Sequence, residues 1–417
     1  MNVKSKFLQQ FIARGFFAQC TNLEELDLQL QNAQNNNKPL VAYIGFDCTA
    51  PSLHIGSLMQ IMMLRLWQKY GNLPIILLGG GTTQIGDPSG KDESRNFLSL
   101  DQININTAGI LQNVSKFLDF NRNSASNSAI LVNNQDWLLN LNYLNFLRDI
   151  GKHFSINKML SFDSVKLRLQ RDQPLSFLEF NYMLLQAYDF LQLYQKHSCT
   201  VQIGGSDQWG NIVNGTELIR KFYASQNQEH QKVFGLTSPL ITTSDGKKMG
   251  KTANGAVWLS ENLSSPFDFF QYFRNVSDAD VERFLKLFTD LDLEQIAYFC
   301  QNNNINQNKE ILAFEVTKIC HTHKQAQDVL EQARAIFISK ENFPIFSLNL
   351  DNANKKLIDI LLEIKVSTSK NEAKKLIQGN AVKINQQVVS DVFYGFNEPC
   401  EFELSVGKKK FFKIILL

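Results

Sequence analysis

The chain has 417 residues, of which 44% are hydrophobic, so it is long enough to form two or three domains with sizeable cores. Its formal net charge of only +2 excludes a chain that is basic throughout, and any surface for nucleic acid must therefore be local. The six cysteines are scattered without a C-x-x-C pair, which argues against a disulfide framework and favours a reducing compartment. No apolar run approaches the length that spans a membrane.

The N-terminal segment carries Lys4, Lys6 and Arg14 and no acidic residue, as targeting presequences do. It lacks the Ser and Arg density of such a presequence, and we expect instead a first helix that ends near Gly15. An amphipathic helix is predicted within residues 22–38, ahead of a polar loop.

Residues 41–57, VAYIGFDCTAPSLHIGS, combine a strand, a tight turn and the start of a helix. The apolar run Val41–Phe46 predicts a buried strand, and Pro51 prevents its continuation. This geometry directs backbone N–H groups and a helix dipole at an anion. His54 and Ser57 lie three apart on the first turn, so both can face one ligand. Taken alone, a helix start with one histidine is a weak signal.

Further strands are predicted at 74–79 and 129–132, and strands that alternate with helices indicate a parallel α/β sheet. The glycine-rich stretch after the second strand matches neither the P-loop nor the dinucleotide fingerprint. Asp87, Lys91 and Arg95 are spaced by four, although a solvated helix face explains the two cations equally well. Residues 151–180 interrupt the strand rhythm with a helical pattern, which predicts an insertion between the two halves of the sheet.

The helical stretch from 180 places Tyr182, Gln186 and Asp189 on one stripe of an otherwise apolar helix. Buried polar groups are costly unless they are satisfied, and an aspartate is seldom buried without a partner. A strand at 200–204 follows, and then the turn GSDQWGN. Glycine turns at the carboxyl ends of parallel strands are typical of the ligand crevice of a doubly wound sheet.

Residues 244–252, SDGKKMGKT, predict a turn with two lysines, Lys248 and Lys251, between the possible hinges Gly246 and Gly250. A solvated basic turn is the simpler interpretation of such a charge run.

The remaining chain is predicted to be helical over 253–340, with helices near 278–289, 293–302 and 308–335. The sequence Cys320-His321-Thr322-His323 resembles a metal site superficially, but zinc needs about four ligands at defined spacing, so we expect no structural metal. Residues 338–353 are predicted to be a linker.

Residues 351–417 form a predicted compact module with 11 Lys and 8 acidic residues. Its features are a capping box at Ser369–Glu372, a helix that carries Lys370, Lys374 and Lys375, and a hairpin at 382–389. Lysines on a short helix beside a hairpin suit phosphate contacts, whereas a solvated helix face is the alternative.

Two of these motifs together resemble the signatures of class I aminoacyl-tRNA synthetases. His54-Ile55-Gly56-Ser57 is similar to the His-Ile-Gly-His motif, with serine at the second histidine, and Lys248–Thr252 is similar to the Lys-Met-Ser-Lys-Ser loop. Their order and separation match the family. Between them, Y-x-x-x-Q-x-x-D and QIGGSDQWGN resemble bacterial-type tyrosyl-tRNA synthetases.

The resemblance implies an α/β fold in three domains. Residues 1–252 would form a catalytic domain with a doubly wound parallel, Rossmann-like sheet and a helical dimerisation insertion near 140–180. Residues 253–340 would form an α-helical domain that meets the anticodon stem, and residues 351–417 a small α+β RNA-binding domain of the ribosomal protein S-four type.

The implied activity is that of a tyrosine–tRNA ligase, which forms tyrosyl-adenylate from L-tyrosine and ATP and then transfers tyrosine to the 3′ end of its tRNA. The implied partners are ATP as a substrate, Mg²⁺ carried with ATP and pyrophosphate, the tRNA specific for tyrosine, and a second copy of the chain. A cytoplasmic location without a membrane partner is expected.

The resemblance also assigns residues. For catalysis it implies His54, Ser57, Lys248 and Lys251, with Thr49 near the phosphates. For tyrosine it implies Tyr43 and Asp189 at the phenol, Tyr182, Gln186 and Asp87 at the ammonium, Gln208 by the carboxylate, and Gln202 close by. For ATP it implies Gly45, Asp47, His54, Gly56, Gly205, Asp207 and Lys251. For tRNA it implies Lys370, Lys374 and Lys375.

Three alternatives stay open. A tryptophanyl-tRNA synthetase shares both signature loops, but an indole offers only one N–H donor to the pair Tyr43 and Asp189. A nucleotidyltransferase with a similar histidine loop is disfavoured by the helical block and the basic module. A non-enzymatic RNA-binding protein would lose no activity on Lys251→Ala.

Overall fold

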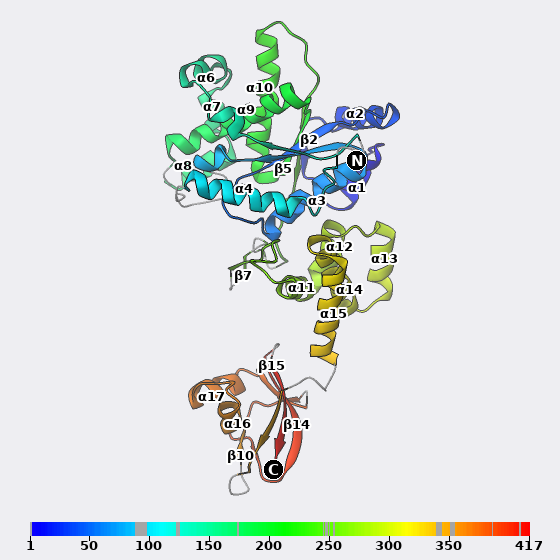
Figure 1. Cartoon of the computed structure of the whole chain (residues 1–417), viewed down its shortest axis with the longest axis vertical. Coiled ribbons are helices and arrows are strands. Elements are labelled where there is room, and N and C mark those ends of the chain that lie inside the picture. Colours follow the sequence, from blue (N-terminus) through cyan, green and yellow to red (C-terminus); the bar gives the residue numbers. More distant parts are fainter. Residues whose placement is uncertain are drawn as a thin grey trace. The chain divides into compact units, whose positions relative to one another are not determined.

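The structure is a computed structural model that forms two compact units, Met1–Val329 and Leu330–Leu417 (Figure 1). It describes residues 2–87, 98–121, 126–172, 175–244, 246, 249, 251–252, 255–338, 344–350, 355–385, 387–407 and 410–417, and gives only the backbone at 163–164, 167, 251–252, 255 and 336–338.

A six-stranded sheet in the order β1–β6–β5–β2–β3–β4 lies at the centre of the first unit. Its strands are β1 (Gln19–Cys20), β2 (Val41–Phe46), β3 (Leu73–Leu78), β4 (Ile130–Asn133), β5 (Val201–Gly205) and β6 (Phe234–Ser238). Neighbouring strands run parallel, except that β1 is antiparallel to β6. The chain passes outward from β2 to β3 and β4 and then returns to the other side of β2, which confirms the predicted doubly wound parallel sheet.

Ten α-helices are described in this part of the chain, as far as α10. They are α1 (Lys6–Ala13), α2 (Leu23–Asn35), α3 (Ile55–Lys69), α4 (Leu100–Val114), α5 (Gln135–Leu138), α6 (Tyr143–Asp149), α7 (Ile156–Leu160), α8 (Asp163–Gln170), α9 (Phe177–His197) and α10 (Trp209–Ser225). Helix α3 is buried on most sides, with nine of its fifteen residues in the core. Trp67 near its end packs edge-on against Phe7 of α1, with ring centroids 4.8 Å apart. A helix enclosed in this way gives its first turn a rigid support.

Helices α5 to α9 lie between β4 and β5 in the sequence and form the helical insertion. Helix α9 starts with a capping box in which Ser176 and Glu179 satisfy each other's backbone N–H groups. Arg168 of α8 donates to the same Glu179 carboxylate at 3.0 Å, and both side chains are largely buried. These contacts fix the start of the helix that carries Tyr182, Gln186 and Asp189.

A helical block completes the first unit, and its last helix extends past Val329 into the second unit. Its helices are α11 (Pro266–Arg274), α12 (Val281–Phe288), α13 (Leu293–Asn302), α14 (Ile305–Cys320) and α15 (His323–Ile338). The predicted single helix at 308–335 is wrong, because α14 ends at Cys320 and α15 begins at His323. His321 turns the chain with a backbone outside helical geometry while its ring packs edge-on against Phe269 at 5.1 Å. The local sequence contains neither glycine nor proline at the break and so predicted a continuous helix. Tertiary packing of the His321 ring ends the helix instead.

The second unit is built on a five-stranded sheet in the order β12–β11–β14–β15–β9. Its elements are β9 (Ile345–Leu348), β10 (Lys355–Lys356), α16 (Leu357–Glu363), α17 (Lys370–Gln378), β11 (Val382–Ile384), β12 (Gln387–Val388), β13 (Gly395–Phe396), β14 (Cys400–Val406) and β15 (Lys410–Leu416). The predicted hairpin at 382–389 is present as β11 and β12. Strand β9 lies where a linker was predicted, and this interpretation is wrong for 345–348, because the segment pairs parallel with β15 and extends the sheet.

The predicted capping box of α17 is formed only in part. Ser369 accepts from the backbone N–H of Glu372 as expected. The Glu372 carboxylate, however, accepts from the backbone N–H and hydroxyl of Thr368, both at 2.7 Å, rather than from the N-cap residue. Threonine at this position offers two donors at once, and the carboxylate takes both.

Candidate active site

A cavity of about 620 Å³ opens at the carboxyl ends of β2 and β5, the two strands between which the winding of the sheet reverses. This is the usual position of a ligand site in an open α/β sheet. The lining residues include the following sequence-predicted ones: Tyr43, Gly45, Asp47, Thr49, His54, Ser57, Asp87, Tyr182, Gln186, Asp189, Gln202, Gly205, Asp207 and Gln208. Side chains predicted from segments far apart in the sequence therefore share one cavity.

Asp189 is the buried acid of this cavity, with 2% of its surface exposed. Its two carboxylate oxygens accept from Asn134 Nδ2 at 2.9 Å and from Trp137 Nε1 at 2.7 Å. Burial raises the pKa of Asp189 to about 7, although these two donors favour the ionised form, and the charge of Asp47 raises the pKa further. The acid is thus held in place and poised to accept a further donor from a ligand.

Tyr43 of β2 lies beside this acid. Its hydroxyl is buried and has no hydrogen-bond partner among the described residues, and its ring packs against Phe190 with centroids 5.4 Å apart. Burial raises the pKa of Tyr43 well above its ordinary value, and the charge of Asp189 adds to the shift. A buried hydroxyl without a partner is costly, so a ligand that supplies one would be favoured at this point.

Two glutamine side chains present further unsatisfied acceptors. The Oε1 atoms of Gln186 and Gln202 are buried and receive no donor from the described residues. Both residues line the cavity. Because each unmatched atom is an acceptor, the complementary ligand group is a donor such as an ammonium.

Polar contacts join the remaining predicted residues across the cavity. Tyr182 donates to Asp47 Oδ2 at 3.3 Å, and Thr82 donates to the other carboxylate oxygen at 2.9 Å. Gln208 Nε2 donates to Asp87 Oδ2 at 2.8 Å. These bonds connect β2, α9, the turn after β3 and the turn after β5.

His54 begins helix α3 as its N-cap, with its Nδ1 accepting from the backbone N–H of Gly56 at 2.9 Å. The His54 ring makes an edge-on contact with the Trp258 ring. The two backbones also pair, since His54 and Trp258 form an antiparallel bridge and Ile55 N–H donates to the Val257 carbonyl. The chain that follows the lysine segment is therefore tied across the start of α3.

Gly56 is required by close packing rather than by an unusual backbone angle. A Cβ added there would lie 2.6 Å from the His54 ring and 3.0 Å from the carbonyl oxygen of Met249. Met249 stands between the two predicted lysines, so the histidine motif and the lysine segment are in direct contact.

Some predicted residues stay untested by this geometry. Lys248, Lys91 and Arg95 lie outside the described residues, and for Lys251 only the backbone is described, in β7 (Lys251–Thr252) opposite β8 (Gly255–Ala256). Lys370, Lys374 and Lys375 lie on α17 of the second unit.

Sequence reasoning missed Asn134, Trp137 and Thr82, which hold Asp189 and Asp47. Asn134 follows directly after β4, and a polar residue at the carboxyl end of a predicted parallel strand is the one signal that could have pointed to it. Within the described part of the chain, no group of three or more His, Cys, Asp or Glu side chains is arranged to hold a metal ion.

A family model for class I tRNA synthetases (W and Y) matches residues 34–338, and a model for the tyrosine–tRNA ligase SYY-like C-terminal domain matches residues 337–414. The chain belongs to the class I tRNA synthetase family of the tryptophan and tyrosine enzymes.

Within this family its full-length relatives are tyrosine–tRNA ligases. The ligase of Wolbachia sp. subsp. Brugia malayi is 50% identical over the whole of both chains, and that of Pelagibacter ubique is 49% identical over 99% of this chain and 100% of the relative. These findings confirm the predicted resemblance to bacterial-type tyrosyl-tRNA synthetases.

Solved structures agree in fold. A C-terminally truncated mitochondrial tyrosyl-tRNA synthetase of Aspergillus nidulans is similar with a TM-score of 0.69 and 29% identity, over 80% of this chain and 95% of that one. A tryptophanyl-tRNA synthetase of Plasmodium falciparum has a TM-score of 0.52 and 15% identity, over 78% and 84%. At this identity the likeness concerns the fold alone.

None of the helices that the structure describes is long and apolar enough to cross a membrane.

Proposed function

We propose that this cavity performs the two-step reaction of a tyrosine–tRNA ligase. In the first step a tyrosine carboxylate oxygen attacks the α-phosphorus of ATP, a P–O bond forms, and the bond to pyrophosphate breaks. In the second step a ribose hydroxyl at the 3′ end of tRNA attacks the tyrosyl carbonyl carbon, and AMP leaves. The observation that carries the proposal is the phenol of Tyr43, which has no partner among the described residues and lies beside the buried Asp189, in the same cavity as the His54 helix start.

The Tyr43 and Asp189 pair suits a substrate with a phenolic hydroxyl. Such a hydroxyl can donate to the Asp189 carboxylate and pair with the hydroxyl of Tyr43 at the same time. Phenylalanine would leave the Tyr43 hydroxyl buried and unpaired and would supply no further donor to Asp189, which is the kind of discrimination for which tyrosyl-tRNA synthetases are the well-known example.

The substrate ammonium is assigned to the opposite end of the polar stripe on α9. Gln186 Oε1 is a buried acceptor without a donor, and an ammonium supplies three N–H donors. Tyr182 and Asp87 line the same cavity, and Gln208, hydrogen-bonded to Asp87, is assigned to the carboxylate side. Gln202 lies close by and adds a second unsatisfied acceptor.

ATP is assigned to the start of α3 and the turns that face it. The positive end of the α3 helix dipole attracts phosphate, and His54, Ser57 and Thr49 line the cavity there. Gly56 leaves room for close approach, and Gly45, Asp47, Gly205 and Asp207 are assigned to the nucleoside. Mg²⁺ enters with ATP and leaves with pyrophosphate.

Lys248 and Lys251 are assigned to the charge that develops on the phosphates. Met249 between them touches the Gly56 position, which brings this segment to the nucleotide end of the cavity. The tyrosine carboxylate is already ionised and needs no general base. Catalysis is therefore positioning and stabilisation of charge.

Transfer RNA is assigned to the helical block and to the second unit. On α17, Lys374 and Lys375 are exposed, and Lys370 is exposed although it pairs with Asp359 at 3.0 Å. Exposed lysines on a short helix provide phosphate contacts that carry no base sequence information.

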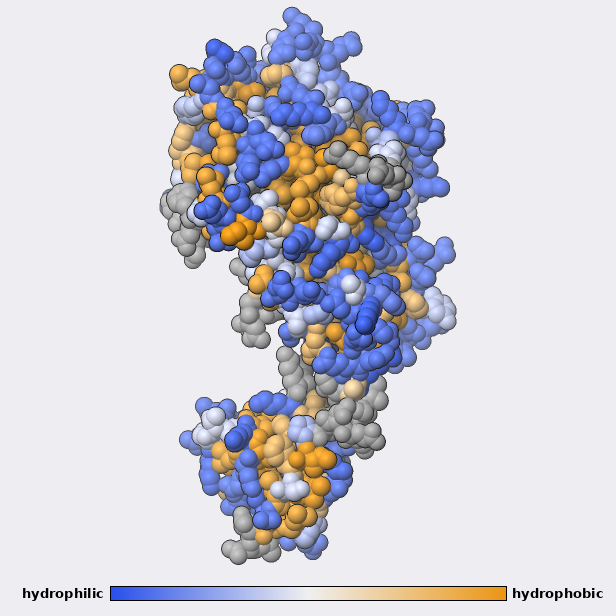
Figure 2. Space-filling model, in the orientation of Figure 1, coloured by the Kyte–Doolittle hydropathy of each residue, from blue (hydrophilic) through white to orange (hydrophobic). Residues whose placement is uncertain are grey.

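A homodimer through the helical insertion is part of the proposal. Large apolar side chains stand exposed on α6, α7 and the start of α9, among them Tyr143, Leu144, Ile156 and Phe177. Figure 2 shows hydrophobic residues gathered on the side of the first unit where Figure 1 places α6, α7 and α8. Large apolar side chains gathered on one side in this way mark an interaction site, and a second copy of the chain is the expected partner.

A cytoplasmic location is proposed as well. All six cysteines are free thiols, and three of them are buried, which fits a reducing compartment.

The decisive experiment is exchange of labelled pyrophosphate into ATP, screened across all twenty amino acids. Tyrosine alone is expected to support exchange, because it alone satisfies both Tyr43 and Asp189. Exchange supported by tryptophan instead would establish the tryptophan ligase, and no exchange with any amino acid would refute the proposed first step.

A further inference from the structure

A second cavity of the first unit, about 590 Å³ in volume, shares no lining residue with the candidate active site. It lies where the end of α1 and the last turns of α3 meet the end of α4 and the end of α12. Its volume is close to that of the first cavity and within the usual range for small-ligand sites. None of the residues assigned to tyrosine or ATP lines it.

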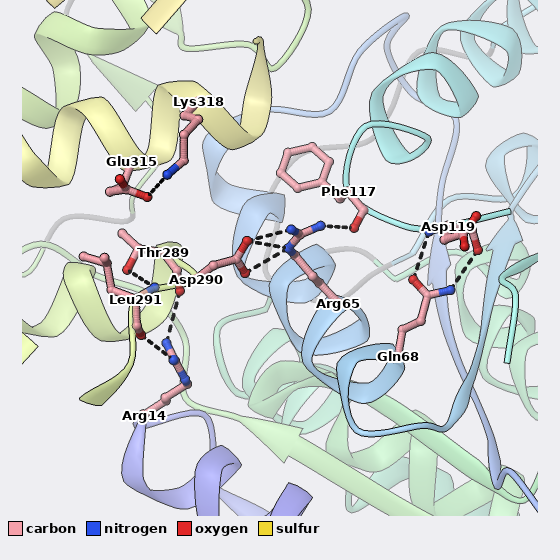
Figure 3. A network of polar contacts seen from close by, with 10 residues as sticks. All are labelled: Arg14, Arg65, Gln68, Phe117, Asp119, Thr289, Asp290, Leu291, Glu315 and Lys318. Atoms are coloured by element: carbon pink, nitrogen blue, oxygen red, sulfur yellow. Dashed lines mark hydrogen bonds and ion pairs between the residues drawn. The ribbon is translucent and has the colours of Figure 1, made fainter. Parts of the chain in front are cut away.

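The walls of this cavity are held by two arginines (Figure 3). Arg65 of α3 makes a bidentate pair with Asp290 and also donates to the carbonyl of Phe117. Arg14 after α1 donates to the carbonyls of Lys286, Thr289 and Leu291 at the end of α12. The cavity is therefore preformed, since contacts from three separate parts of the chain fix its shape.

Positive charge exceeds negative charge around this cavity. The charged lining residues are Arg14, Arg65, Lys69, Lys116 and Lys286, against Asp119 and Asp290, which gives five cations to two anions and a formal excess of three. Lys286 pairs with Glu282 at 2.7 Å, and Arg65 pairs with Asp290. In the described part of the chain, no acidic side chain pairs with Lys69 or Lys116.

A buried donor also lacks a partner here. Arg14 is only 5% exposed, and its Nε has no hydrogen-bond partner among the described residues. Burial lowers the pKa of Arg14, whereas the nearby Asp290 acts in the opposite direction. A buried N–H without an acceptor is costly, and Arg14 is one of the residues that line this cavity.

We propose that this cavity binds a small phosphate-bearing anion. The excess positive charge selects for a ligand with more than one negative charge, and phosphate oxygens are strong acceptors for lysine and arginine donors. Lys69 and Lys116 supply the exposed charges, and Arg14 supplies the buried donor. The site is distinct from the one assigned to ATP.

The test is calorimetric titration of the full-length chain with pyrophosphate, orthophosphate and ribose 5-phosphate. Pyrophosphate is expected to fill two sites per chain, one lost in His54→Ala and the other weakened at least about tenfold in Lys69→Gln/Lys116→Gln. Because neither lysine belongs to the proposed active site, the double variant should keep its tyrosine-dependent pyrophosphate exchange, which also shows that it is folded.

The matched control is Lys38→Gln/Lys324→Gln, which removes two exposed lysines outside this cavity. It should bind as the unchanged chain does. Orthophosphate binding at the second site would show that a free phosphate suffices, and tighter binding of ribose 5-phosphate would show that the ligand is a phosphorylated metabolite. A single pyrophosphate site, or equal weakening in the control, would overturn the proposal.

Discussion

Asp189 combines full burial with two neutral hydrogen-bond donors, and no cationic side chain pairs with it in the part of the chain that the structure describes. Asn134 and Trp137 orient the carboxylate without neutralising it. Its remaining acceptor capacity is then available to a ligand hydroxyl, which is the property that a site for tyrosine requires.

Replacing Asp189 by asparagine should therefore impair tyrosine recognition. Asparagine keeps the shape, but its amide NH2 group presents a donor where a carboxylate oxygen of Asp189 presented an acceptor. We expect kcat/KM for tyrosine in pyrophosphate exchange to fall roughly 100-fold, the cost of an unsatisfied buried group. KM for ATP should change little, and an unaltered kcat/KM for tyrosine would refute the assignment of Asp189.

The raised pKa of Asp189 also predicts a pH dependence of stability. The folded chain holds this proton up to about pH 7, whereas the unfolded chain releases it near pH 3.8. Stability of the ligand-free protein must fall as pH rises through this window, by up to about 4 kcal/mol, and stay constant above it. Urea unfolding measures this change. Between pH 5 and pH 8 the free energy of unfolding should fall less in Asp189→Asn than in the unchanged chain.

Gly56→Ala tests the contact between the histidine motif and the lysine segment. The added methyl group would lie 3.0 Å or less from both the His54 ring and the Met249 carbonyl, so one of them must move. We expect pyrophosphate exchange to fall at least about tenfold, with KM for ATP affected more than KM for tyrosine. Gly151→Ala is the control, because its nearest neighbour would be a leucine side chain at an ordinary 3.5 Å.

At the residue scale, the sequence predicted those side chains that belong to a local pattern. Tyr182, Gln186 and Asp189 share one helix stripe, and their common cavity could be anticipated. Asn134 and Trp137 come from the end of β4 and from α5, and no spacing in the sequence relates them to Asp189. Only the folded sheet brings these donors to the acid.

At the element scale, backbone hydrogen bonds tie Met249 and the chain at 257–259 to neighbouring segments. Met249 N–H donates to the carbonyl of Ile241, and the chain at 257–259 pairs with Leu53 and Ile55 ahead of α3. These bonds hold the chain at 257–259 beside the start of α3, where the proposed ATP site lies.

Lys251→Ala is expected to reduce the rate of adenylate formation far more than the affinity for tyrosine. A lysine that meets the phosphates mainly in the transition state stabilises that state selectively. Single-turnover formation of tyrosyl-adenylate measures the rate, and tyrosine titration measures the affinity. Equal losses in the two would contradict a role in the transition state.

The junction of α14 and α15 contains a second group whose ionisation is coupled to folding. His321 is buried against Phe269, and neither ring nitrogen has a partner among the described residues. Burial lowers the pKa of His321 to about 4. The unfolded chain binds this proton near pH 6.5. The contribution of the neutral His321 to the free energy of unfolding is therefore fully present above pH 6.5 and is lost as pH falls towards 4.

His321→Phe should remove this loss, because phenylalanine keeps the edge-on ring contact and has no proton to bind. The difference amounts to about 3 kcal/mol between pH 7 and pH 4. Urea unfolding at both pH values measures the difference. The free energy of unfolding of the variant should exceed that of the unchanged chain at pH 4 and not at pH 7. A constant difference at both values would indicate a packing effect alone.

Helices and strands were predictable where a local apolar pattern and a residue such as proline set their bounds. Strand β2 was bounded correctly because its apolar run meets a polar turn with Pro51. Strand β9 was missed because its four residues become a strand only by pairing with β15, almost seventy positions later. Local pattern cannot report a partner at that distance.

At the scale of the whole molecule, the apolar side of the insertion predicts the oligomeric state. Leu144 is 74% exposed and Phe177 is 71% exposed, which is unusual for large apolar side chains without a partner. Leu144→Asp/Phe177→Asp should convert a dimer to a monomer in sedimentation velocity, because it places charges in the interface. Tyr298→Asp changes a side chain on α13 that is 61% exposed and should leave the mass unchanged.

The hydrogen bonds from Arg14 to the carbonyls at the end of α12 affect the order in which the chain folds during its synthesis. Its acceptor carbonyls are 272 to 277 positions downstream. At 5–20 residues per second, a ribosome needs roughly 14 to 55 s to deliver them. Throughout that delay the guanidinium stays hydrated, so the amino-terminal helix can wait in solution and dock only when the nascent helical block emerges.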